Sequence, residues 1–134
     1  MTRILIILSI IIFSSCNSKK EVNTLTKEQI HKIEKIQFTL LEVHPVSLEE
    51  TINIFKSDQN PDSEINIWLQ MANTYEWYLK TKGILDLKTK EEVFKLILSR
   101  SMMTEEEAII DSELKILTQK EAREILSHYA LPPE

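Results

Sequence analysis

The chain has 134 residues, 28% of them charged, and a formal net charge of -5. One glycine is too few for the many tight turns of an all-β protein. An acidic chain without a basic block also offers no electrostatic surface for nucleic acid. With Cys16 as its single cysteine, the protein can form no internal disulfide bond, so the core alone must hold the fold.

The first sixteen residues have the organisation of a secretory signal. A short start that includes Arg3 precedes residues 4–13, which are apolar apart from Ser9, and small residues then lead to Cys16. A helix of this apolar length spans about 15 Å, roughly half of the hydrocarbon core of a bilayer. A cleaved signal is therefore favoured over a transmembrane span. It is also favoured over a core helix with a buried thiol, because such a helix would carry polar residues along one face.

This segment resembles the signal peptide of bacterial lipoproteins, through Phe13-Ser14-Ser15-Cys16, which ends in the obligatory cysteine of that family. Phenylalanine stands where leucine is most common in the family, and Ser15 stands where glycine or alanine is more usual. The resemblance implies removal of residues 1–15 and attachment of several acyl chains to Cys16, which would anchor the protein stably in a membrane. Because Asn17 is not aspartate, the resemblance favours the outer membrane.

The chain after Cys16 divides into a tether and a domain. Residues 16–24 have little apolar content and are expected to form a flexible tether. Residues 25–134 are expected to form an all-α domain, a small bundle of five to six capped helices with a central aromatic-rich helix. The main signal is a recurring capping box, in which a serine or threonine and a glutamate or glutamine three positions later satisfy each other's backbone N–H groups. Boxes occur at Thr26/Gln29, Ser47/Glu50, Thr89/Glu92, Thr104/Glu107 and Thr118/Glu121.

The boxes and the apolar spacing place the helices. The first is predicted over residues 27–43, with Phe38 on its apolar side, and it ends because a residue before proline leaves the helical region. The second spans residues 48–56. The third begins at Pro61 and ends at Gly83, the only glycine, which suits a left-handed C-cap. The fourth spans residues 90–100, and two shorter helices begin at Glu105 and Gln119.

The third helix is the richest segment, INIWLQMANTYEWYLK over residues 65–80. Its apolar residues cover so much of the surface that it is expected to be central, with helices on several sides. Trp77 lies nine residues from Trp68, which turns it about half a revolution away. We therefore consider two alternatives, that these aromatic residues are core or that Trp77 and Tyr78 form an exposed surface that binds a partner.

Three clusters resemble metal or catalytic sites but lack essential members. Residues 58–69 begin like a calcium loop, yet Ser63 stands at the glycine position and Leu69 replaces the bidentate glutamate. His31 and Glu34 share a helical face and could hold a metal only with ligands from elsewhere. The acids at 105–107 fit a helix start, where the dipole favours negative charge. Since no phosphate loop, GxSxG motif or Cys/His pair occurs, we predict no catalytic residues, no metal and no cofactor.

The sequence thus favours a non-enzymatic lipoprotein of the bacterial cell envelope that binds another macromolecule, a protein and not a nucleic acid. An immunity or inhibitor protein against a toxin is one alternative, since an acidic domain could complement a basic enzyme. A small metal-dependent enzyme is another alternative. An exposed Trp77 in an apolar patch would favour binding, whereas His31, Glu34 and a third ligand around one cavity would favour the enzyme.

Overall fold

The computed structural model describes residues 24–129. Within this range the chain forms six α-helices and no strand, which confirms the predicted all-α class. The predicted signal peptide, Cys16 and the tether up to residue 23 lie outside the described residues. The helices are α1 (Lys27–Leu40), α2 (Leu48–Lys56), α3 (Pro61–Lys82), α4 (Leu87–Arg100), α5 (Glu105–Asp111) and α6 (Gln119–Tyr129).

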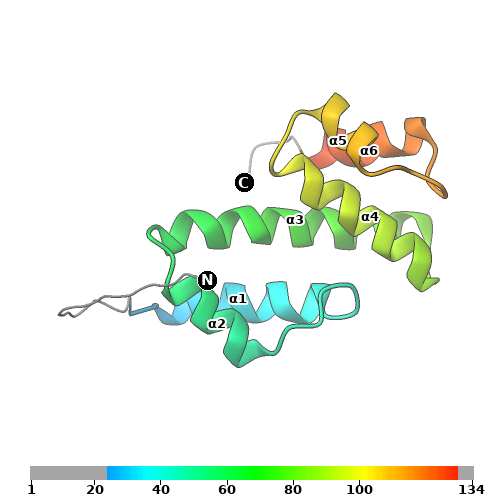
Figure 1. The fold of residues 1–134 in the computed structure, drawn as a ribbon. Helices are drawn as coiled ribbons and strands as arrows, with labels where there is room; N and C mark the ends of the chain where they lie inside the picture. The colour runs from blue at the N-terminus through cyan, green and yellow to red at the C-terminus, as the bar shows by residue number, and fades with distance from the viewer. Residues whose placement is uncertain (1–23, 130–134) are drawn as a thin grey trace, which may run out of the picture.

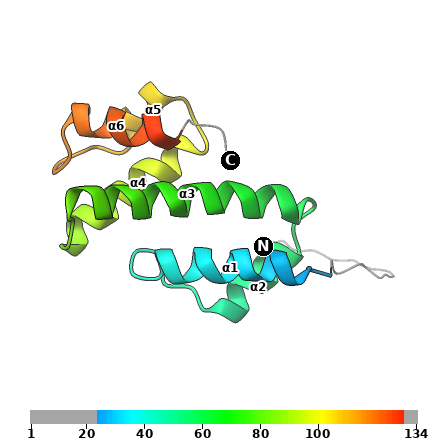
Figure 2. The ribbon, with the colours of Figure 1, turned by 180° about the vertical axis from the view of Figure 1, so that it is seen from behind.

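Helix α3 is the central element of the described chain. It packs against α1 and α2 on one side and against α4 and α6 on the other, while α5 packs on α4 and α6. Figures 1 and 2 show α3 running between these two groups of helices. The predicted central position of the aromatic-rich helix is therefore confirmed, and both groups depend on α3 for a shared core.

The core is built around apolar faces of α3 and α1. Helix α3 buries residues on both sides, among them Ile65, Met71 and Tyr78. On α1 the buried side chains are Ile33, Ile36 and Leu40, which form one stripe because residues three and four apart share a helical face. The prediction that Phe38 lies on the apolar side is wrong, since its side chain is 80% exposed and lies off this stripe.

Most of the predicted helix starts are confirmed by their caps. Both bonds of the capping box form at Thr26/Gln29, Thr104/Glu107 and Thr118/Glu121. Ser47 accepts the N–H of Glu50 and so caps α2.

The box predicted at Thr89/Glu92 is wrong. Helix α4 begins three residues earlier than expected, with Asp86 as its N-cap. The Asp86 carboxylate accepts both the N–H (2.9 Å) and the hydroxyl (2.7 Å) of Thr89. These bonds, with the side-chain bond from Thr89 first, lower the pKa of Asp86.

Glu92, left without a capping role, instead holds the connection between α5 and α6. Its carboxylate accepts the backbone N–H groups of Lys115 (3.0 Å), Ile116 (2.9 and 3.2 Å) and Leu117 (2.7 Å). Burial alone would raise the pKa of Glu92, but these three donors together lower it. One side chain on α4 therefore satisfies three backbone groups of a connection that has no helix of its own.

The C-terminus of α3 is closed by Gly83, as predicted. Gly83 has φ of +65°, and the following N–H, from Ile84, donates to the carbonyl of Leu79 at 2.9 Å. This is the bonding of a Schellman motif, in which the left-handed residue is usually glycine because a Cβ is disfavoured there.

Replacing Gly83 with alanine should lower the free energy of unfolding by about 1 kcal/mol, the cost of a left-handed L-residue. A Cβ at this position would meet no atom within 4 Å, so steric contact should add nothing. Urea denaturation of wild type and Gly83→Ala measures the difference, with Lys82→Ala in the last turn of α3 as the control. An equal stability of Gly83→Ala and wild type would contradict the strain argument.

Candidate functional site, a pocket between α1, α2 and α3

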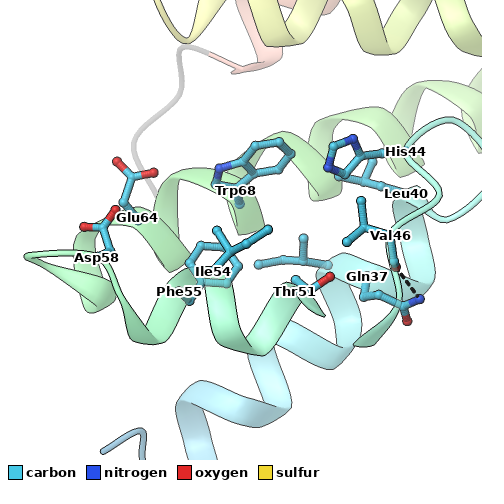
Figure 3. Close-up of a pocket in the computed structure, with 11 residues that line it drawn as sticks. Gln37, Leu40, His44, Val46, Thr51, Ile54, Phe55, Asp58, Glu64 and Trp68 are labelled. Carbon is cyan, nitrogen blue, oxygen red and sulfur yellow. Dashed lines mark hydrogen bonds between the residues drawn. The ribbon is translucent and has the colours of Figure 1, made fainter. Parts of the chain in front are cut away.

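An open pocket of about 100 Å³ lies between the first three helices (Figure 3). It is lined by Ile36, Gln37, Leu40, His44, Val46, Thr51, Ile54, Phe55, Asp58, Glu64 and Trp68. The lining follows α2 along its length, from Val46 before the helix to Asp58 after it. With nine residues α2 is about 14 Å long, whereas α3 with 22 residues is about 33 Å long.

The floor of the pocket is apolar. Ile36 and Leu40 reach it from α1 and are almost fully buried, and Phe55 reaches it from α2 at 5% exposure. Ile54, also on α2, lies at the edge and is 55% exposed. An apolar floor that remains open to solvent is typical of sites that receive an apolar group from a ligand or partner.

One wall of the pocket is formed by His44 and Trp68. Their rings stack at a centroid distance of 5.4 Å and an interplanar angle of 28°, and the ring centroid of Phe94 lies 5.8 Å from that of His44. His44 is held there by the end of α1, which closes at Leu40 and not at residue 43 as expected. The N–H groups of Val43 (3.1 Å) and His44 (2.7 Å) both donate to the Leu40 carbonyl, so the final turn tightens before Pro45.

The polar side chains of the pocket differ in what they contact. Gln37 donates from Nε2 to the carbonyl of Val46 at 3.1 Å, and the Thr51 hydroxyl donates to the carbonyl of Ser47 at 2.7 Å. Asp58 and Glu64 lie together at one end of the pocket and His44 lies at the other (Figure 3). The histidine and the carboxylates are thus too separated to form a hydrogen-bonded acid–base pair, and the two acids give the pocket a negative end.

The structure separates the two aromatic residues predicted to bind a partner. Tyr78 is 1% exposed, so the prediction that it lies on a partner surface is wrong, and burial raises its pKa. Trp77 is partly buried and stacks on His128 of α6, with ring centroids 3.9 Å apart and planes at 3°. The half-revolution between the tryptophans is confirmed, because Trp68 faces the α1–α2 side and Trp77 faces α6. Contact of Trp77 with a partner stays a prediction.

The other sequence candidates occupy ordinary structural positions. Asp58 and Asn60 accept the N–H groups of Asn60 (2.9 Å) and Ser63 (3.3 Å), so their oxygens organise the start of α3. His31 and Glu34 lie 3.7 Å apart on an exposed face of α1. Between residues 24 and 129, no group of three His, Cys, Asp or Glu side chains could hold a metal ion. In the same range no helix is long and apolar enough to cross a membrane.

Comparisons with protein-family models, with curated proteins and with solved structures give no match. The pocket must therefore be judged on its own geometry. Sequence reasoning missed it because it depends on how α1, α2 and α3 pack together, which no local pattern specifies. One signal could have indicated it, since His44-Pro45 interrupts the first helix beside a long aromatic helix and so places a ring near Trp68.

Proposed function

We propose that this protein is a lipid-anchored binding module of the bacterial cell envelope, which holds a protein partner at the α1–α2–α3 pocket. The main observation that supports the binding role is the open apolar pocket with an aromatic wall. Interfaces draw most of their binding energy from a few side chains that enter such pockets and lose their contact with water. The anchoring half of the proposal is supported by the resemblance of residues 1–16 to lipoprotein signals.

The negative end of the pocket supports a basic partner. An immunity or inhibitor protein that covers a basic toxin would be one member of this class, and the acidic net charge of -5 is compatible with it. The surface charge would then direct the approach of the partner, while the apolar contacts would hold it.

Photo-crosslinking in cells tests the binding role. A photoreactive residue at position 54, on the edge of the pocket, should capture one protein. The same residue at position 38 should not, because Phe38 is also exposed but does not line the pocket. Thr51→Phe, which places a ring in the pocket, should abolish the adduct at position 54 while the far-ultraviolet circular dichroism stays unchanged. Equal capture at both positions, or an adduct that survives Thr51→Phe, would refute the pocket as the binding site.

A further inference from the structure

The polar atoms around the pocket indicate the chemistry of its occupant. The amide of Gln37 and the hydroxyl of Thr51 already donate to backbone carbonyls of the protein. The Glu64 carboxylate has no hydrogen bond or ion pair to any residue from 24 to 129. The pocket therefore offers an apolar floor and, at one end, a carboxylate with acceptor capacity that no side chain within that range uses.

Acidic side chains outnumber basic ones in the segment that forms this end of the pocket. Residues 56–64, which form this end, carry the acids Asp58, Asp62 and Glu64 against the single lysine Lys56. Among the other lysines, Lys32 of α1 donates to the side chain of Asn66 at 3.1 Å, and Lys90 of α4 pairs with Glu42 at 2.9 Å. Several acids within about one Debye length of each other produce a negative local potential that attracts cations and repels anions.

The volume restricts the apolar part of the occupant. A closed cavity of roughly 150 Å³ accepts a molecule of the size of benzene. A pocket of about 100 Å³ suits a smaller, branched aliphatic group such as the side chain of leucine or isoleucine. The stacked rings of His44 and Trp68 form a flat wall against which such a group would pack.

We infer that the pocket binds a leucine or isoleucine side chain of a protein partner that carries a neighbouring lysine or arginine, with the cation placed against Glu64. The inference rests on the proposed function and names its recognition chemistry. The apolar side chain fills the floor, and the cation meets the carboxylate at the acidic end. Charge complementarity selects this partner over one with an acidic flank, because a like charge would be repelled there.

Peptide titration of the full chain, reconstituted in lipid nanodiscs and labelled with ¹⁵N at tryptophan, tests the inference. The probe is an alanine-rich helical peptide with one leucine and, one turn away, one lysine. It should shift the indole resonance of Trp68, which lines the pocket. The indole resonance of Trp77, which stacks on His128 of α6, should stay unchanged. A peptide with alanine for the leucine should not bind, and one with glutamate for the lysine should bind at least about threefold more weakly, as expected for a partly exposed ion pair.

Glu64→Gln should remove the preference for the lysine peptide, and Glu50→Gln is the matched control, since Glu50 is an acid at the start of α2 that does not line the pocket. Equal affinity for the lysine and glutamate peptides in wild type would overturn the charge requirement and leave the binding module intact. The inference would also fall if only 3-methylbutylammonium, the free small molecule, shifted Trp68, or if the chain itself dimerised through the pocket. Capture of no protein at position 54 would instead refute the proposed function.

Discussion

Replacing Glu92 with glutamine should lower the free energy of unfolding by about 2 kcal/mol, the scale of lost hydrogen bonds to a charged acceptor. The wild-type carboxylate accepts three backbone N–H groups from residues 115–117. Glutamine has nearly the same shape, but it offers one acceptor oxygen and turns an NH₂ group toward N–H donors. At least one donor of the α5–α6 connection would lose its partner, because the N–H groups of Lys115 and Leu117 donate to different oxygens of the carboxylate.

The matched control is Glu91→Gln, which removes the same charge from an exposed neighbouring position on α4. It should change stability by less than about 0.5 kcal/mol, as is usual for a surface substitution. Urea denaturation at pH 7 measures both variants. Equal losses in Glu92→Gln and Glu91→Gln would show that general charge, and not the three backbone bonds, accounts for the effect.

The pH dependence gives a second measure of the Glu92 bonds. Because the pKa of Glu92 is lowered in the folded protein from its ordinary value of 4.5, the carboxylate adds stability above that value. This contribution is lost as the pH falls from 4.5 through the folded-state pKa. The difference between wild type and Glu92→Gln should therefore be largest at neutral pH and shrink in acid. A difference that stays constant down to pH 3 would contradict the assignment.

Local patterns predicted the helices well where one residue pair decides the start. They failed at α4, because Asp86 and Thr89 are both good N-caps and the sequence alone does not rank them. Asp86 prevails in the structure, where it accepts two bonds from Thr89. Glu92 is then available for partners at least 23 residues away, and a pattern that spans four residues contains no information about such distant groups.

The candidate site was harder to predict than the fold for a related reason. The helical period correctly turned Trp68 and Trp77 to opposite sides of α3, but it could not say which neighbour each would meet. Trp77 contacts His128, and Trp68 contacts His44. The pocket beside Trp68 depends on how α1, α2 and α3 pack and on the turn after α1, which brings His44 against Trp68, and both are properties of tertiary packing.

Replacing Cys16 with alanine should abolish lipid attachment altogether, the largest effect expected from any single substitution in this chain. The lipid would be attached through the sulfur of Cys16, and alanine offers no nucleophile to accept it. Cells fed a radiolabelled fatty acid should label the wild-type protein and leave Cys16→Ala unlabelled. Wild type should fractionate with the outer membrane, and the variant should leave that fraction, since stable anchoring requires more than one acyl chain.

Ser18→Ala is the matched control, because it changes a small residue on the same segment and leaves the cysteine in place. The intact mass of the wild-type protein then distinguishes a lipid anchor on Cys16 from an uncleaved membrane span of residues 4–13. A lipid anchor predicts that wild type begins at Cys16 with acyl chains added, whereas a span predicts the full chain without them. Unchanged labelling of Cys16→Ala would refute the anchor, and an unlabelled wild type of full-length mass would favour the span. Either result would leave the pocket and its basic partner to be tested independently, because both rest on residues 24–129.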